Sequence, residues 1–358
     1  MNSRMTANDM AVPSAPRDTL VWRWRALSVT FPKRSLKGCA VLSCVLVMAV
    51  ILSLGIGTIM LSPPQVIAAL LGKGDPINVY LIHQLRLERI GAALASGAGF
   101  GLAGCLLQTL TRNRLAMPDI IGINNGATGF AVASIVALPM GLAPPLWALV
   151  GAVTATALTF ALAGGVGTRG YRFIIVGVGV GALFGALTNL MLARSSIDEA
   201  NAAFAWTVGS LNSTGSGAQW MMWVGLLVCL PAALCYARQL SGLRFAEAVA
   251  QGWGLRPARL RVLALVLAVV CAALAVALAG PVGMIALAGP ECARWLSSKR
   301  TMPVVNSAIA GAVLMMLADL LGRTLFSPVE IPVGIVTSLL GSPFLIWMLL
   351  RGRISTTL

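Results

Sequence analysis

The sequence predicts an all-α, multi-pass membrane protein with about ten transmembrane helices, and three observations lead to this prediction. Of the 358 residues, 58% are hydrophobic and only 10% are charged, whereas ordinary soluble domains carry about 25% charged residues. Apolar runs of about twenty residues, the length that a helix needs to cross a bilayer, recur along the chain. Basic residues gather in alternate connections between these runs, as cytoplasmic loops of membrane proteins require.

The first 38 residues form a basic segment ahead of the first apolar run. Trp22 and Trp24 alternate with arginines there, which is typical of a juxtamembrane segment at a lipid interface. We expect this segment to be loosely ordered in the cytoplasm. The polar lead is too long for a cleavable signal peptide, and the run that follows is long enough to span the bilayer.

Residues 39–351 are predicted to form one transmembrane domain. Prolines and glycines mark many of the joints between its spans, and the shortest span, the eighth, begins directly after Gly280 and Pro281. Hydropathy places the ten spans at residues 39–61, 90–110, 120–138, 144–166, 173–193, 220–237, 262–280, 282–297, 304–326 and 331–350.

The distribution of basic residues predicts that both termini are cytoplasmic. With ten spans and the N-terminus inside, 21 of the 26 lysines and arginines fall in inner segments. The net charge of +15 is therefore explained by topology, and no aromatic-interleaved basic patch indicates a nucleic-acid partner. The outer side keeps five basic residues: Lys73, Arg86, Arg89, Arg194 and Arg323.

Three connections are predicted to carry short helices. One follows Pro63 and Pro64 on the outer side, and a second runs through Trp206 in the outer segment 194–219. The third lies in the largest inner loop, 239–260, and ends near Gly252. Its apolar face would either lie on lipid or dock into another protein.

The residue types that carry chemistry are poorly represented. The seven cysteines lie in or beside apolar runs without metal-ligand spacing, and the chain has a single histidine, His83. No Walker A motif, catalytic triad or paired carboxylate site occurs. We therefore expect no metal, no cofactor and no catalytic activity in this chain.

One ordered set of motifs is specific enough to indicate a family. It begins with RLER at Arg86–Arg89, continues after a glycine-rich span with QTLTRNRLAMPDIIG at Gln108–Gly122, and ends with NGA at Asn125–Ala127. This run resembles the FecCD-type permeases of iron–siderophore and vitamin B12 ABC importers, whose pattern is close to RLPR…Q…TRNPLA.PD.LG…GA. The ferric-enterobactin type is the most similar. Further matches extend the resemblance over roughly residues 55–351: Gly177–Gly181, Gly209–Leu211, Glu247-Ala248, Gly254-Leu255, Ala279–Gly283, Ala318-Asp319, Arg323 and Pro332–Phe344.

Three positions depart from the family pattern. Glu88 replaces the proline of RLPR, and Arg114 replaces the proline after the Arg-Asn pair. Glu291 lies where the family frequently has histidine in Pro-His-Ile-Ala-Arg. All three are loop or helix-end positions, so they affect the expected loop geometry and leave the resemblance intact.

The resemblance implies a BtuC-like type II ABC importer fold, with helices 2–5 and 7–10 related as an inverted repeat. It also implies partners: a second permease subunit, identical or paralogous, two cytoplasmic ATPase subunits and an extracytoplasmic siderophore-binding protein. ATP and magnesium would then be bound by the ATPase subunits. The chain itself would be a multi-pass protein of the bacterial plasma (inner) membrane, in contact with lipid.

The family's motifs imply roles for individual residues at both membrane surfaces. Arg86, Arg89 and Arg323 match arginines that receive acidic residues of the binding protein, and guanidinium groups suit this because they bind carboxylates bidentately. The alternative is interfacial snorkelling or local pairing, with Asp319 at i−4 of Arg323. On the inner side, the resemblance implies ATPase coupling for five residues: Phe245, Glu247, Ala248, Trp253 and Gly254.

The fifth span and the bend before it match the family's translocation path. Thr168, Arg169 and Gly170 fall at the position of the cytoplasmic gate. Gly177 and Gly181 resemble part of a nucleotide fingerprint, but they lie inside an apolar span with no preceding strand, so close helix packing is the interpretation. Thr188 and Asn189 are predicted to face the path.

These inferences predict the permease subunit of an ATP-driven importer that moves ferric siderophore and so serves iron ion homeostasis. Vitamin B12 or haem import is the alternative within the class. A secondary transporter is the alternative from another class, since inverted repeats also occur there. It would need ion-coupling acids at mid-membrane, where none of the eleven acidic residues is convincingly placed.

Overall fold

The computed structural model describes residues 19–24, 27–57, 59–136, 144–164, 171–212, 216–243, 245, 247–298 and 302–352. Each of the ten predicted spans corresponds to a helix of this described part. The helices are α1 (Lys33–Gly55), α4 (Leu87–Thr111), α5 (Ile123–Val136), α6 (Pro144–Ala163), α7 (Tyr171–Arg194), α9 (Ser216–Gly242), α11 (Pro257–Ala279), α12 (Gly283–Leu296), α13 (Val304–Thr324) and α14 (Val333–Gly352).

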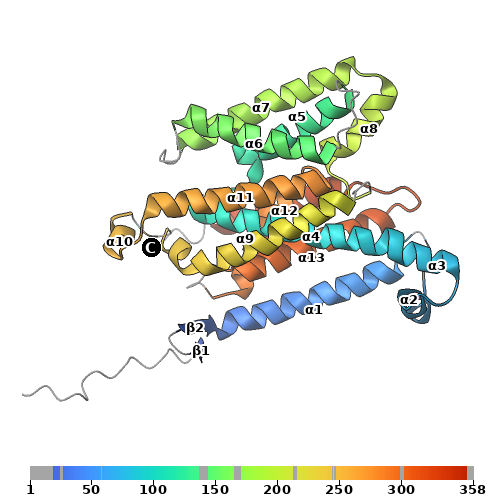
Figure 1. Cartoon of the computed structure of the whole chain (residues 1–358), viewed down its shortest axis with the longest axis horizontal. Helices are drawn as coiled ribbons and strands as arrows, with labels where there is room; N and C mark the ends of the chain where they lie inside the picture. Colours follow the sequence, from blue (N-terminus) through green and yellow to red (C-terminus); the bar gives the residue numbers. More distant parts are fainter. Residues whose placement is uncertain are drawn as a thin grey trace, which may run out of the picture.

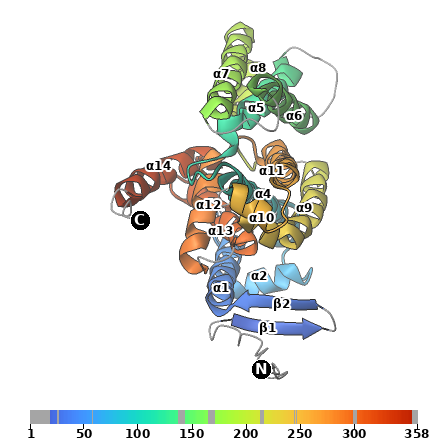
Figure 2. The same ribbon diagram turned by 90° about the vertical axis from the view of Figure 1, so that its left-hand side faces the viewer.

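The helices form two packed groups. Helices α4, α9, α11, α12 and α13 make the central bundle, and α5, α6 and α7 pack together at one side of it, with α1 on the opposite side (Figures 1 and 2). The helix lengths repeat: α4 to α7 have 25, 14, 20 and 24 residues, and α11 to α14 have 23, 14, 21 and 20. This pattern supports the predicted repeat of helices 2–5 and 7–10.

Helix α4 lies at the centre because its small residues let neighbouring backbones approach. The apolar window of its helical stretch is 89% buried, against 22% for α9. A side-chain carbon on Gly101 would collide with the carbonyl oxygen of Ser307 in α13, and one on Gly104 with that of Ala286 in α12. Van der Waals contacts of this kind drive helix association in membranes. The hydrophobic effect cannot do so there, because the lipid tails are as apolar as the helix surfaces.

The close packing of α4 gives a testable expectation. Gly104→Ala should lower the free energy of unfolding by about 1–3 kcal/mol, because the added methyl group meets backbone that cannot rotate away. Gly179→Ala in α7 is the matched control, since a Cβ there would have no neighbour within 4 Å. Thermal unfolding in detergent measures both variants. Equal melting temperatures would contradict the packing role.

Two of the ten helices are too short to cross a bilayer alone. Helices α5 and α12 have 14 residues each, or about 21 Å at 1.5 Å per residue, against a hydrocarbon core of about 30 Å. The 3-10 helix η2 (Pro118–Ile121) precedes α5, and the link 280–282 precedes α12. Ile121 and Val282 are buried, as non-helical backbone at membrane depth must be. Seven helices in the described residues meet the length and apolarity expected of a span.

The three predicted short helices are present, and the sequence did not predict two further ones, at Pro76–Tyr80 and Leu81–Arg86. On the predicted outer side these are α2 (Pro63–Leu70), α3 (Pro76–Tyr80), the π-helix η1 (Leu81–Arg86) and α8 (Ile197–Val208), and α10 (Glu247–Gly252) lies in the predicted inner loop. Capping boxes begin α2 at Ser62 and α8 at Ser196. Figure 1 shows α10 at one end of the molecule and α2, α3 and α8 toward the other. The connections predicted to be inner and those predicted to be outer therefore lie toward opposite ends of the molecule.

The N-terminal segment corrects one expectation. Strands β1 (Thr19–Trp24) and β2 (Leu27–Pro32) pair as an antiparallel hairpin, and α1 begins at Lys33 rather than at residue 39. The expectation of a loosely ordered segment was wrong for these residues. The alternation of tryptophan with arginine is also the period of a β-strand, in which successive side chains point to opposite faces.

Candidate functional site

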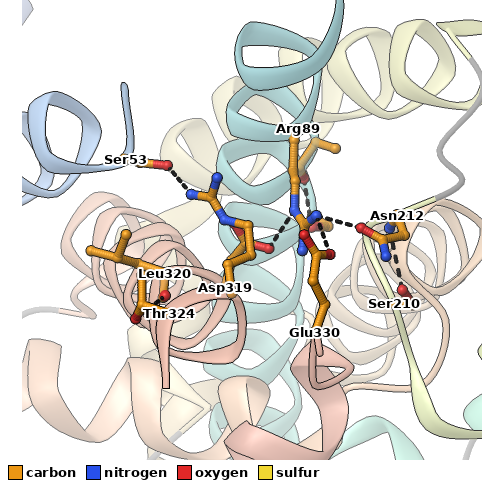
Figure 3. Close-up of polar contacts among 11 residues, drawn as sticks. Ser53, Arg89, Ser210, Asn212, Asp319, Leu320, Thr324 and Glu330 are labelled. Carbon is orange, nitrogen blue, oxygen red and sulfur yellow. Dashed lines mark hydrogen bonds and ion pairs between the residues drawn. The ribbon is translucent and has the colours of Figure 1, made fainter. Parts of the chain in front are cut away.

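A network of charged side chains lies at the predicted outer end of the central bundle (Figure 3). The two oxygens of Asp319 in α13 each hold one guanidinium group: Oδ1 is 2.7 Å from Nε of Arg89 in α4, and Oδ2 is 3.1 Å from Nε of Arg323 in α13. Glu330 in the α13–α14 connection adds an ion pair of 2.8 Å to Nη1 of Arg89. The predicted i, i+4 pairing of Asp319 with Arg323 is confirmed.

The three arginines differ in accessibility. Arg86 and Arg323 are only 4% and 6% exposed, whereas the side chain of Arg89 is 17% exposed. Arg86 donates hydrogen bonds to the carbonyl oxygens of Leu54 and Ile59, and Nη2 of Arg323 donates to the Ser53 hydroxyl at 2.5 Å. Both buried arginines thus fasten the outer end of α1. Docking stays a prediction for all three, with Arg89 the most accessible.

The ion pairs of the network centre on Arg89. Two guanidinium groups, those of Arg89 and Arg323, pair with the two carboxylates of Asp319 and Glu330, whereas the hydrogen bonds of Arg86 go to backbone carbonyls. Arg89 also donates a hydrogen bond to the amide oxygen of Asn212. Partial burial would raise the pKa of Glu330, but hydrogen bonding and charge from Arg89 outweigh it and hold that pKa below its usual value. Sequence reasoning missed Glu330 and Asn212, whose only signal is their position in outer loops.

The predicted coupling element forms an exposed aromatic corner. The rings of Phe245 and Trp253 meet edge to face with 5.1 Å between their centroids, and the two residues are 52% and 59% exposed. Val249 of α10, four residues from each of them, is exposed as well. Glu247 begins α10, and Ala248 and Gly254 are exposed. The helix and its apolar face are as predicted. Contact with an ATPase stays a prediction.

The predicted path residues divide into three groups. Thr168, Arg169 and Gly170 lie outside the described residues. Gly177 and Gly181 are buried and approach the backbone of η2 and of Gly122, in agreement with close packing.

Thr188 and Asn189 of helix α7 lie in different environments. Thr188 is buried against Gly129 of α5, and its hydroxyl donates to the carbonyl oxygen of Phe184 at 2.8 Å. Asn189 is exposed. The prediction that both face a path is corrected for Thr188, which faces a neighbouring helix, and it remains open for Asn189.

A second ion cluster, which sequence reasoning did not assemble, lies at the predicted inner end. Glu291 of α12 is only 3% exposed and pairs with Arg294 at 2.6 Å and with Arg114 at 3.6 Å. Arg294 also donates to the amide oxygen of Gln108 in α4 at 2.6 Å. The sequence held one indication of this cluster: Arg114 and Glu291 both depart from the family pattern, and they carry opposite charges.

No group of three or more histidine, cysteine, aspartate or glutamate side chains in the described part of the chain could hold a metal ion. The arrangement consists of an ion-paired network at the predicted outer end and an exposed aromatic corner at the predicted inner end.

Comparison with known proteins gives consistent matches. The model of the FecCD transport family matches residues 45–351. The achromobactin transport system permease protein CbrC of Dickeya dadantii (strain 3937) is 37% identical over 343 residues, covering 93% of this chain and 97% of CbrC. The ferric enterobactin transport system permease protein FepG of Escherichia coli (strain K12) is 35% identical, covering 89% of this chain and 97% of FepG.

A more distant relative and a solved structure extend these matches. The hemin transport system permease protein HmuU of Yersinia pestis is 33% identical, covering 75% of this chain and 83% of HmuU. Among solved structures, a metal-chelate type ABC transporter in an inward-facing conformation matches with a TM-score of 0.77 and 28% identity. That match covers 87% of this chain and 98% of the other chain.

Proposed function

The chain belongs to the FecCD transport family, and from this premise we propose that it is the membrane-spanning permease subunit of an ATP-driven importer of ferric siderophores. The observation that carries the proposal is the family match over residues 45–351. The geometry supports it, because helix α4 runs from the outer network at Arg89 to the inner corner, where Arg112 bonds the backbone next to α10.

The substrate is proposed from the relatives. FepG is named for ferric enterobactin, and its identity and coverage favour a ferric siderophore. HmuU is named for hemin, which keeps haem as the second candidate, with vitamin B12 behind it. A secondary transporter is disfavoured, because Asp319 and Glu291, which are only 2% and 3% exposed, are both neutralised by arginines.

The partners are proposed from the two ends of the bundle. The outer network would receive acidic residues of an extracytoplasmic siderophore-binding protein at Arg89, the most accessible of its arginines. The exposed corner of Phe245 and Trp253 would enter a groove of a cytoplasmic ATPase subunit, which binds ATP and magnesium. A second permease subunit, identical or paralogous, would complete the pathway. In the proposed orientation both termini would lie in the cytoplasm of a bacterium, with the protein in its inner membrane.

Uptake by cells tests the substrate. A strain that lacks this gene should lose import of iron-labelled ferric siderophore and regain it when the gene is restored, while hemin and vitamin B12 uptake stay at wild-type levels. Loss of hemin or vitamin B12 uptake with unchanged siderophore uptake would transfer the assignment to that substrate. Wild-type uptake of all three in a strain without redundant importers would contradict the proposal.

Substitutions of two paired side chains in the outer network should change the affinity for the binding protein differently. Arg89→Gln should weaken binding of the binding protein about tenfold, because the amide cannot pair with a partner's carboxylate. Glu330→Gln removes an acid that occupies Arg89, so binding should be as tight as in the wild type or tighter. Lys73→Ala removes an exposed, predicted outer charge that takes no part in the ion pairs of the network, and it is the control.

Surface plasmon resonance with the permease in nanodiscs measures these affinities. Equal weakening by Arg89→Gln and Glu330→Gln would assign the network to stability alone and would contradict docking at Arg89.

A further inference from the structure

Arg112 has an unusual backbone conformation. It is the one residue other than glycine in the described part of the chain with a positive φ, at φ 53° and ψ 28°. Left-handed backbone is uncommon outside glycine, and such outliers persist where surrounding contacts hold them. Arg112 ends α4, so its conformation sets the direction in which the chain leaves the central helix.

The side chain of Arg112 supplies the holding contacts. Its Nε donates a hydrogen bond of 2.7 Å to the carbonyl oxygen of Leu243, and its Nη2 donates to that of Phe245. Both carbonyls belong to the link between α9 and α10, far away in sequence. A guanidinium group can hold two acceptors at fixed geometry, whereas a lysine ammonium is a single point charge. Arg112 therefore fixes where the α10 corner sits relative to α4.

The connection that follows Arg112, residues 112–122, contacts two further helices, one through its backbone and one through a side chain. The carbonyl oxygen of Ile120 lies so close to Gly177 of α7 that a side chain at position 177 would collide with it. The carboxylate of Asp119 lies similarly against Gly283, the first residue of α12. At Gly177 backbone meets backbone, so no flexible side chain is there to absorb a displacement.

A charged contact joins the same connection to a second position on α12, eight residues after Gly283. Arg114 pairs with Glu291 at 3.6 Å, and Glu291 is anchored by Arg294 at 2.6 Å. The connection is thus bonded to the link that leads into α10 on one side, and it contacts α7 and two positions of α12 on the other.

We propose that Arg112 is a positioning residue that ties α10 to the 112–122 connection, so that a displacement of α10 moves α7 and α12. The proposal rests on the proposed function, because an ATPase subunit must be what displaces α10. Intermediate position alone does not establish coupling between sites. A test must therefore separate coupling from folding.

The test uses the reconstituted complex of permease, ATPase and binding protein, with iron-labelled ferric siderophore. Arg112→Gly removes both hydrogen bonds but accepts the left-handed backbone without strain, so folding should survive. We expect uptake per ATP hydrolysed to fall about tenfold, within the range that single residues of coupled networks produce. Arg112→Lys should retain part of the coupling. Arg259→Ala changes an exposed arginine at the start of α11 and should stay within about twofold of wild type.

The outcomes separate the two claims. Absence of ATP-dependent uptake in the wild-type complex would refute the proposed function itself. With wild-type uptake intact, wild-type coupling in Arg112→Gly would overturn the role of Arg112. A melting temperature lowered by more than about 5 °C together with lost uptake would also overturn it, since Arg112 would then serve folding alone. If Arg112→Gly is not recovered, wild-type uptake per ATP in Arg112→Lys overturns the proposal.

Discussion

Asp319→Ala is expected to lower the free energy of unfolding by about 3–5 kcal/mol, the cost of breaking a buried ion pair by removing one partner. The Asp319 side chain is 1% exposed, and its two oxygens neutralise Arg89 and Arg323 at 2.7 and 3.1 Å. Without the carboxylate, the buried Arg323 guanidinium keeps its bond to Ser53 but loses its ion pair. Chemical denaturation of the purified chain in detergent measures the change.

Glu88→Ala is the matched control for Asp319. Glu88 is an exposed acid in the first turn of α4, one residue from Arg89. Its removal should cost no more than about 1 kcal/mol, the value of a favourable charge at a helix N-terminus. If Asp319→Ala and Glu88→Ala destabilised the chain equally, the outer network would not be the structural centre that its burial indicates.

Phe245→Asp is expected to abolish ATP hydrolysis stimulated by loaded binding protein while leaving the fold intact. Phe245 is 52% exposed and packs edge to face on Trp253, so its loss costs the isolated chain little. In the assembled transporter, the new carboxylate would be buried in an apolar groove of the ATPase without a partner, which is strongly unfavourable. Stimulated hydrolysis in the reconstituted complex and the melting temperature of the chain are the two measurements.

Gln251→Asp controls for the added charge. Gln251 is an exposed residue of α10 two positions from Val249, which places it on the opposite side of the helix. We expect stimulated hydrolysis close to wild type. Equal loss in both variants would indicate a general effect of negative charge near the inner surface and would contradict a specific apolar contact.

The sequence predicted the elements whose causes are local. The ten spans follow from runs of apolar residues long enough to cross a bilayer. Helix α2 follows from Pro63 and Pro64 at its first turn, and α10 from the apolar spacing between Phe245 and Trp253. The pairing of Asp319 with Arg323 was also predictable, because residues four apart meet on one face of a helix.

The remaining features depend on which helices become neighbours. Nothing near Arg86 in the sequence shows that the carbonyls of Leu54 and Ile59 will enclose it. The burial of Thr188 and exposure of Asn189 depend on the rotation of α7 against α5. The bond from Arg112 to Leu243 joins residues 131 positions apart, so no local pattern could reveal it.

Transport by proteoliposomes tests the central claim most directly. The vesicles would contain this chain, its partner permease and the ATPase, with ATP on the ATPase side and binding protein loaded with iron-labelled ferric siderophore on the other. ATP-driven import predicts accumulation of labelled iron that requires hydrolysable ATP and is insensitive to proton and sodium ionophores. Accumulation without ATP, driven by an ion gradient and abolished by those ionophores, would contradict it and identify a secondary transporter.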